Sequence, residues 1–475
     1  MRTLVWFRSD LRARDNTALL AACRRSDQGV VGLFIISPQE WEDHEVAPVR
    51  IDFLMRSLRE MSAALEARGI PLRVEVVKRA SDVPKAVIGQ ARACACDAIA
   101  FNCEYEVDES RRDAAVVAAA AKHALQAWAF TDQIILAPED VRTKADTPFR
   151  VFTPFKKQWL TVLEQRGGVE VGGLPPRQAV VGVASTPIPD SVSGFTPPPH
   201  ASMWEAGEAA ARKRLDRFIE NRLDAYQNAR DQPGIDGTSQ LSPYLASGCL
   251  SPRQCIAAAW PVHAKAPRGG AATWISEVIW REFYVHVMAA FPRVCMGRAF
   301  QPATERVAWR TSPGDAQAWR EGRTGIPIVD AGMRQLATTG WMHNRVRMIT
   351  AMFLAKNLLL DWRTGESWFM RNLVDGFFAS NNGGWQWAAS TGTDAVPYFR
   401  VFNPVTQSLR FDPEGAYIRR YVPELEALSH KSIHEPWRSK IPPRDYPKPI
   451  VDLASSRKRA IEAFRAIRGP ADEHQ

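Results

Sequence analysis

The chain has 475 residues, of which 45% are hydrophobic, so it holds enough apolar material for two or three domains with their own cores. No apolar run approaches the roughly 18 residues of a membrane helix, so the sequence predicts no membrane span. The net charge of +9 favours a polyanionic partner, and the seven scattered cysteines lack the spacing of a zinc site. The N-terminal segment MRTLVWFRSDLR lacks the apolar centre of a secretory signal, which together with the unclustered cysteines predicts a reducing, cytoplasmic location.

Residues 1–130 alternate between short apolar runs and alanine-rich helical stretches. The apolar runs cover residues 4–7, 30–36, 72–77 and 98–102, and helical stretches include 51–68 and 114–127. This alternation predicts a Rossmann-like α/β domain with a parallel sheet and helices on both faces. No Gly-x-Gly-x-x-Gly follows the first run, so the usual mode of dinucleotide binding is not predicted here.

Residues 131–203 are rich in proline and poor in periodicity, which predicts a long interdomain linker. Residues 204–475 show helical periodicity and no strand signals, so we expect an all-α domain. The helical stretches that we expect in it are 205–225, 273–290, 328–338, 345–360 and 367–373. Twelve of the sixteen tryptophans lie after residue 200, as expected for a domain that encloses a large ligand or stacks on bases.

One helical stretch carries a polar stripe. Trp274, Glu277, Arg281 and Tyr284 fall at i, i+3, i+7 and i+10, with Trp280 beside them, and apolar residues cover the other faces. This pattern predicts a buried helix whose polar stripe faces a cavity. The alternative is an exposed Glu277–Arg281 ion pair, worth about 0.3–0.5 kcal/mol.

Two further motifs suit a planar ligand. Asn344, Arg347 and Met348 share a helix face, which favours a polar aromatic ligand, although a satisfied core amide beside gap-filling methionines is the alternative. The run NNGGWQW over residues 381–387 combines amides, glycines and tryptophans. Amides offer donors and acceptors, glycines permit close backbone approach, and tryptophans stack and can be oxidised. We expect this run to hold an aromatic heterocycle and to move electrons.

Several long blocks together carry a resemblance to a known family. They are WISEVIWREFY, GIPIVDAGMRQL, GWMHNRVRM and NNGGWQWAASTGTDAVPYFR, and the match extends from Trp6 to about Pro449. The chain resembles the cryptochrome/photolyase family, and within it the bacterial class I cyclobutane pyrimidine dimer photolyases. The resemblance implies a noncovalent FAD in the helical domain and light-driven electron transfer from reduced FAD to a pyrimidine dimer that has been flipped out of DNA.

The resemblance also implies roles for individual residues. Asn381 matches the position that faces flavin N5, where plant cryptochromes carry Asp and insect cryptochromes carry Cys. The residues matched to FAD contacts are Tyr226, Thr238, Ser239, Gln240, Leu241, Ser242, Trp274, Glu277, Arg281, Asn344, Arg347, Asp375, Gly376, Phe377 and Asn381. Glu277 would stabilise the dimer radical anion. The residues matched to DNA and lesion contacts are Arg230, Trp280, Asn344, Arg345, Met348, Trp387 and Arg400, and those matched to an electron relay are Trp385, Trp362 and Trp309.

Four positions depart from the class I pattern. Gln240 stands where Arg is usual, and Phe377 replaces an acid after Asp375-Gly376. In the antenna region His44 and Glu109 match folate contacts, but Asp108 replaces Asn, and Met296 stands where folate-binding relatives carry Lys. We expect 5,10-methenyltetrahydrofolate as the antenna, with a deazaflavin or no antenna as the alternatives.

The competing function is a cryptochrome-type blue-light receptor that signals through protein partners. The short segment after residue 468 and the presence of the lesion-contact residues favour repair. Histidine at the position of Met348 is usual in (6-4) photolyases, so we expect a cyclobutane dimer as substrate. The expected partner is UV-damaged DNA, with no membrane association and a monomeric state.

Overall fold

The computed structural model describes residues 1–179, 181–393 and 400–467, which form two compact units. The first unit consists of Met1–Asp224, Ser239–Pro292 and Val374–Gly376. The second consists of Ala225–Thr238, Arg293–Leu373 and the residues from Phe377 onwards. Each unit draws on segments that are far apart in the sequence. The predicted domain boundaries at residues 130 and 203 stay predictions.

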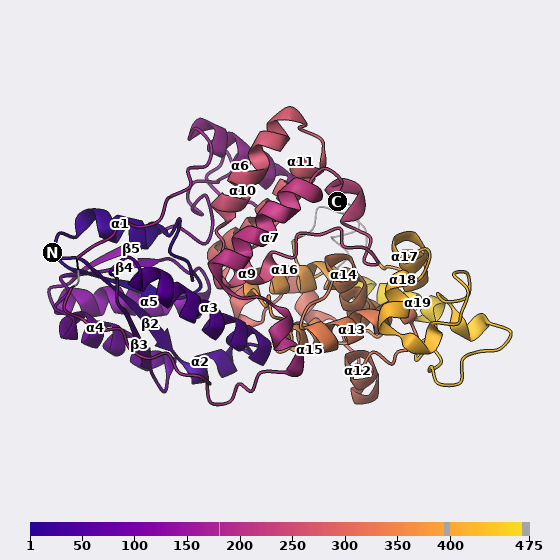
Figure 1. Cartoon of the computed structure of the whole chain (residues 1–475). Helices are drawn as coiled ribbons and strands as arrows, with labels where there is room; N and C mark the ends of the chain where they lie inside the picture. The colour runs from indigo at the N-terminus through magenta and orange to yellow at the C-terminus, as the bar shows by residue number, and fades with distance from the viewer. Residues whose placement is uncertain (180, 394–399, 468–475) are drawn as a thin grey trace. The chain divides into compact units, whose positions relative to one another are not determined.

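Five parallel strands form the sheet of the first unit, in the order β3-β2-β1-β4-β5 (Figure 1). They are β1 (Thr3–Phe7), β2 (Val30–Ile36), β3 (Leu72–Val76), β4 (Ala98–Asn102) and β5 (Gln126–Phe130). The predicted parallel α/β domain is confirmed, and its first four strands lie within one residue of the expected runs. The sequence does not predict β5, because this partly exposed edge strand extends an alanine-rich stretch of helical composition.

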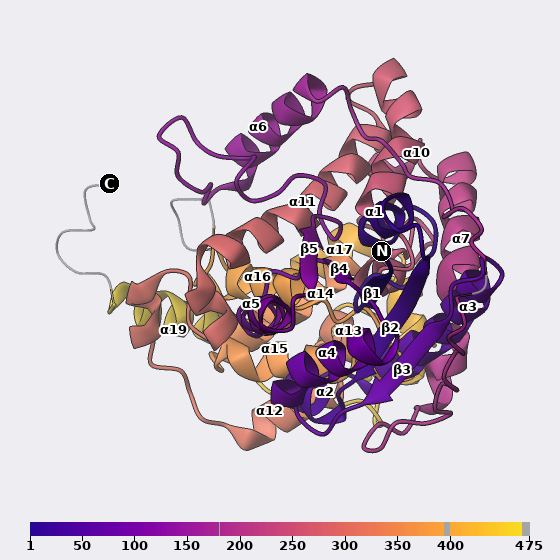
Figure 2. The same cartoon turned by 90° about the vertical axis from the view of Figure 1, so that its left-hand side faces the viewer.

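Helices cover both faces of this sheet. Figure 2 shows α4 and α5 on one face and α1 and α3 on the other. These helices are α1 (Thr17–Arg25), α3 (Pro48–Glu66), α4 (Val83–Ala93) and α5 (Val107–Lys122). On the α4–α5 side, Trp6, Leu33 and Phe101 pack against Val87 and Val116. Every residue of β1 and β2 is buried, as expected for central strands that are covered on both sides.

The segment after the sheet contains a helix, so the expectation of little periodic structure between residues 131 and 203 is wrong for α6 (Phe152–Gln165). Phe155, Trp159 and Leu163 recur every four residues and are buried. They form one apolar stripe, which packs against α11 (Gly270–Ala290). The other helices of the first unit are α2 (Pro38–Asp43), α7 (Gly207–Asn221), α9 (Ser242–Ser247) and α10 (Pro252–Lys265).

The described residues of the second unit form helices and no strand. These are α8 (Tyr226–Ala229), α12 (Pro313–Arg320), α13 (Pro327–Thr339), α14 (Asn344–Met352), α15 (Trp362–Met370), α16 (Phe378–Ala389), α17 (Pro404–Phe411), α18 (Ala416–Tyr421) and α19 (Leu453–Arg465). The expected helix over 345–360 is shorter, because α14 passes into a π-helical turn at Phe353–Asn357. Among the described residues, no helix combines the length and the apolar character that a membrane crossing requires.

The NNGGWQW run lies inside α16. The glycines therefore continue a helix, and a Cβ on Gly384 would meet nothing within 4 Å. Trp385 of the same run is 2% exposed and belongs to the main hydrophobic core of the second unit, together with Trp319, Trp362 and Tyr417. Residues 394–399 of the longest family-like block lie outside the described residues.

Candidate functional site

The predicted polar stripe of α11 faces the segment that leads into α9. Trp274 is 3% exposed, and its Nε1 donates to Ser239 Oγ at 3.4 Å. Arg281 donates from Nη1 to the Gln133 carbonyl at 2.7 Å and from Nη2 to the Leu245 carbonyl at 3.3 Å. Burial lowers the pKa of Arg281 to about 10. Glu277 and Arg281 are both half-buried, so the alternative of an exposed ion pair is wrong.

Helix α7 packs on the same segment. Phe218 lies 5.1 Å from the Trp274 ring, centroid to centroid, and Arg214 Nη1 donates to Gln240 Oε1 at 3.0 Å. Gln240 has a φ of 49°, in the left-handed region that few residues other than glycine adopt. The first unit thus brings together Ser239, Gln240 and Trp274 from the predicted FAD contacts, with Arg214 of α7 bonded to Gln240.

A second group of matched residues in the first unit lies between α15 and α16 in sequence. Asp375 is 6% exposed, and the Gly376 carbonyl accepts from Arg50 Nη1 of α3. Burial lowers the pKa of Arg50, while nearby carboxylates, including Asp375, oppose this shift. Phe377 is the first residue of the last segment of the second unit. It is 8% exposed, as expected for an apolar side chain.

In the second unit, the start of α14 presents several matched residues. His343 caps this helix, with its Nδ1 accepting from the Arg345 N–H at 3.2 Å. Asn344 is exposed and Met348 is half-buried, so the alternative of a satisfied core amide does not hold. Arg347 of the same helix donates from Nε to the Met342 carbonyl at 2.8 Å.

The matched arginines of the second unit contact a carboxylate or an aromatic ring of the protein. Arg345 Nη2 lies 2.8 Å from Asp231 Oδ1, and Arg230 Nε lies 3.7 Å from the same oxygen. Arg400 places its guanidinium carbon 5.2 Å from the centroid of the Trp387 ring. Two guanidinium groups therefore share the Asp231 carboxylate.

The amides of α16 form a hydrogen-bond chain that ends on α15. Asn381 donates from Nδ2 to the Glu366 carbonyl oxygen at 3.0 Å, and Asn382 donates from Nδ2 to Glu366 Oε1 at 3.0 Å. Gln386 Nε2 in turn donates to Asn382 Oδ1 at 2.9 Å. Glu366 is 8% exposed and was missed in the sequence analysis, because only its contacts to the two amides reveal its role.

The three relay tryptophans lie at α15 or beside the residues that precede it. A Cβ on Gly365 would lie 2.0 Å from Cη2 of Trp385, so the indole lies directly against α15, whose first residue is Trp362. The residue after Trp309, Arg310, donates from its N–H to the Leu359 carbonyl at 2.8 Å. Trp385 and Trp362 belong to one core, and the half-buried Trp309 packs against it.

The predicted antenna residues lie together in the first unit. His44 places Nδ1 3.3 Å from Glu109 and Nε2 3.7 Å from Asp108. The hydrogen bond that His44 donates to the Glu109 carboxylate raises the pKa of His44 to about 9. Burial, with Glu109 and Glu104 nearby, raises the pKa of Glu106 to about 7. This part of the unit is therefore rich in carboxyl groups, with His44 as a cation near neutral pH.

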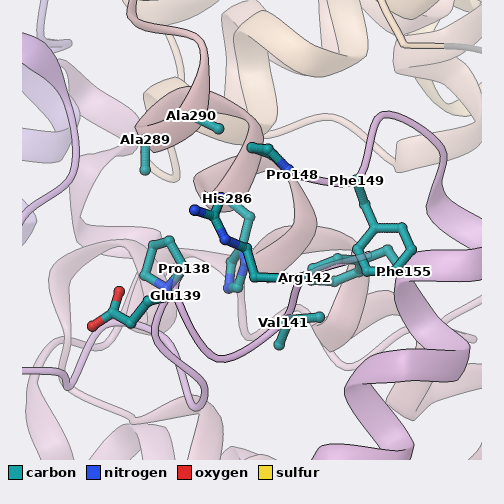
Figure 3. Close-up of a pocket in the computed structure, with 10 residues that line it drawn as sticks. All are labelled: Pro138, Glu139, Val141, Arg142, Pro148, Phe149, Phe155, His286, Ala289 and Ala290. Carbon is teal, nitrogen blue, oxygen red and sulfur yellow. The ribbon is translucent and has the colours of Figure 1, made fainter. Parts of the chain in front are cut away.

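A cavity of about 290 Å³ lies elsewhere in the first unit, beside the last turns of α11. Figure 3 shows Phe149 and Phe155 together on one side of it and Glu139 on the other. His286, in its lining, is nine residues from Glu277, which corresponds to about 13 Å along the helix. None of the predicted site residues lines this cavity.

The chain is similar to known proteins over nearly all of its length. Residues 3–175 match the DNA photolyase family, and residues 274–466 match the FAD binding domain of DNA photolyase. The deoxyribodipyrimidine photo-lyase of Salmonella typhimurium is 44% identical over 470 residues, which cover 98% of this chain and 98% of that protein.

Solved structures agree with this similarity. The bacterial class III photolyase from Agrobacterium tumefaciens has a TM-score of 0.86 at 34% identity, and the match covers 98% of this chain and 97% of that one. The cryptochrome of Synechocystis sp. PCC6803 has a TM-score of 0.83 at 28% identity, with 98% and 99% covered. The chain therefore belongs to the DNA photolyase family.

Proposed function

We propose that this protein repairs cyclobutane pyrimidine dimers in DNA by light-driven electron transfer. The observation that carries this proposal is the 44% identity, over 98% of both chains, to a protein named deoxyribodipyrimidine photo-lyase. The residues described above supply the groups that such a reaction needs: donors for a cofactor, an oriented amide, a lesion-facing carboxylate and a chain of oxidisable rings.

FAD fits the donor set of the site. Bound in its reduced form, FAD would supply the electron for light-driven opening of the cyclobutane ring. Ser239 and Gln240 offer polar side chains to its phosphates, and the Trp274 indole offers an apolar wall. Tyr226, Thr238, Leu241, Ser242, Arg281, Arg347, Asp375, Gly376 and Phe377 complete the proposed contacts.

Asn381 is proposed to present an oxygen to the N5 edge of the flavin ring. Its Nδ2 is held by the Glu366 carbonyl, so its side-chain orientation is set before any ligand arrives. An amide whose N–H donates elsewhere offers its carbonyl oxygen as an acceptor, which suits a protonated N5. The Glu366 carboxylate holds the neighbouring amide of Asn382, whereas Asn381 is held by the backbone carbonyl of the same residue.

The lesion is proposed to lie against Glu277, Asn344 and Met348. Glu277 would hydrogen-bond the dimer and stabilise the negative charge that it gains. Trp280 and Trp387 would form aromatic walls. One face of Trp280 is covered by Phe152, whose ring is 3.6 Å away and nearly parallel, at 10°, and the Tyr284 ring lies 5.6 Å from the same indole.

Arg230, Arg345 and Arg400 are proposed to bind the DNA backbone. Contacts to phosphate fix the position of the strand and carry no sequence information, which suits an enzyme that recognises a lesion in any sequence. Trp385, Trp362 and Trp309 are proposed to carry an electron inward when the cofactor is oxidised, because tryptophan side chains can be oxidised and the first two share one core against which Trp309 packs.

We further propose a monomer in the cytoplasm that carries 5,10-methenyltetrahydrofolate as antenna. His44 is a cation near neutral pH and suits the anionic tail of a folate, while Glu109 accepts from pterin N–H groups. Light scattering would measure the oligomeric state. Absorbance after addition of the folate to purified protein would show a bound antenna, and an unchanged spectrum would contradict it.

The function is tested with purified, chemically reduced protein and a single-stranded oligonucleotide that bears one thymine dimer. Recovery of thymine absorbance under blue light, and not in the dark, is the expected result. Bound FAD without any light-dependent recovery would contradict repair. It would favour the light-receptor alternative, for which the similarity to the Synechocystis cryptochrome fold provides the observation.

A further inference from the structure

Residue 240 supplies no positive charge to the segment that is proposed to hold the FAD phosphates. The two phosphates carry negative charge, whereas Ser239 and Gln240 offer only neutral dipoles. Gln240 turns its side-chain oxygen toward Arg214 of α7, and the Arg214 Nη1–Gln240 Oε1 distance is 3.0 Å. A cation thus reaches the segment from a different helix.

A second contact places the same face of α7 on this segment. Phe218 is one turn after Arg214, and its ring lies 5.1 Å from Trp274, whose Nε1 donates to Ser239 Oγ. Residues four apart share a helix face, so the face of α7 that carries Arg214 also packs, through Phe218, on the Trp274 ring that bonds to Ser239. The position of Arg214 does not depend on a single hydrogen bond.

The guanidinium of Arg214 has N–H donors that its protein contacts do not use. It has five N–H donors, of which Gln240 Oε1 takes one and the Tyr244 hydroxyl a second. No carboxylate in the described part of the chain forms an ion pair with Arg214. The rings of Trp204 and Tyr244 lie 5.9 Å from its guanidinium carbon, and they keep this half-buried side chain extended toward residue 240.

We propose that Arg214 is a phosphate-binding residue of the FAD site, and that Gln240 orients it. This inference rests on the proposed FAD-dependent function. The physical reason is that a guanidinium binds phosphate through two parallel, charge-assisted hydrogen bonds, which a glutamine amide cannot replace. The amide oxygen of Gln240 instead fixes the guanidinium, so less side-chain freedom is lost when the cofactor binds.

The test measures the dissociation constant for FAD by fluorescence titration of the apoprotein, with no repair assay involved. Arg214→Gln should weaken FAD binding about tenfold or more, as the loss of a charge-assisted hydrogen bond predicts. Arg217→Gln is the matched control, because this exposed arginine lies one turn further along α7 and should leave the constant unchanged.

Exchanging Arg214 and Gln240 for each other tests the proposal more specifically than the single substitution. Arg214→Gln combined with Gln240→Arg returns the cation to the other member of the pair and should recover most of the affinity. Equal FAD binding by wild type and Arg214→Gln would overturn the inference. So would a weakened Arg214→Gln variant that the exchange fails to rescue although circular dichroism shows it folded. Absence of FAD binding by the wild type would instead contradict the proposed function itself.

Discussion

At the scale of single residues, Glu277 is placed to act on the lesion with little effect on the fold. It is half-buried on α11, between Trp274 and Arg281. We expect Glu277→Ala to keep bound FAD and to lower the repair yield about tenfold or more, because one charge-assisted hydrogen bond to the dimer is lost. Flash-induced repair per bound FAD is the measurement, with Glu220→Ala on α7 as an exposed control. Unchanged repair would remove the role assigned to Glu277.

His44 gives a prediction on pH. Its pKa is raised to about 9, above the value of about 6.5 expected in the unfolded chain. The stabilisation from pairing with Glu109 is therefore fully present below about pH 6.5 and is lost as the pH rises through 9. We expect the difference in Tm between wild type and His44→Gln to shrink over this range. A difference that is constant with pH would show that His44 is not protonated in the folded protein.

At the scale of elements, one carboxylate ties α6 and the preceding loop to α11. Glu282 is 1% exposed and accepts from the N–H groups of Ile135 and Leu136 at 2.8 and 2.9 Å and from Trp159 Nε1 at 2.6 Å. Glu282→Gln cannot accept on both oxygens, so we expect a loss of about 1–3 kcal/mol in the free energy of unfolding. Denaturant titration is the measurement, and a loss no larger than that of the exposed Glu220→Gln would contradict this role.

The contact of α15 with α16 underlies the proposed relay. We expect Trp309→Phe to slow photoreduction of the oxidised cofactor, because phenylalanine is far harder to oxidise than tryptophan. Repair by chemically reduced protein should be unaffected, since Trp309 is not proposed to touch the lesion. Steady-state photoreduction with an added thiol and the repair assay separate the two effects. Loss of repair in the reduced variant would mean that the relay is misassigned.

Physical reasons explain why the sequence predicts some elements and not others. Strands β1, β2 and β4 are buried apolar runs, so their sequences report their structure directly. The edge strand β5 is partly exposed and has alanines that suit a helix as well. Helix α6 lies in a proline-rich segment, and its stripe of Phe155, Trp159 and Leu163 becomes visible only when a partner face on α11 is known.

In the candidate site, too, the sequence predicts some residues and not others. Family-like motifs identified the residues that are proposed to contact ligands, such as Trp274 and Asn381, because these residue types are unusual in their context. Residues that act through another residue left no such signal. Glu366 is recognised only from its contacts to two amides, and Arg214 only from its contact to Gln240. Tertiary contacts between distant segments cannot be read from one sequence without an alignment.

At the scale of the whole molecule, the net charge of +9 predicts DNA binding that weakens with salt. Three phosphate contacts correspond to a slope of about −2 to −3 in a plot of log K against log salt concentration. We expect Arg400→Ala to lower affinity for damaged and undamaged DNA alike and to reduce this slope by about 1. Fluorescence anisotropy at several salt concentrations measures both, with Lys122→Ala on α5 as the control. An unchanged slope would show that Arg400 binds no phosphate.

The carboxylate that Arg230 and Arg345 share has a consequence for how damage is found. A DNA phosphate that approaches these arginines competes with Asp231, so part of each attraction is cancelled by a group that never leaves. A repair protein must release intact sites quickly, because these vastly outnumber lesions in a genome. If Arg230 and Arg345 bind the DNA backbone as proposed, Asp231 would weaken their hold on undamaged sequence, and the flipped dimer would determine where the protein stays.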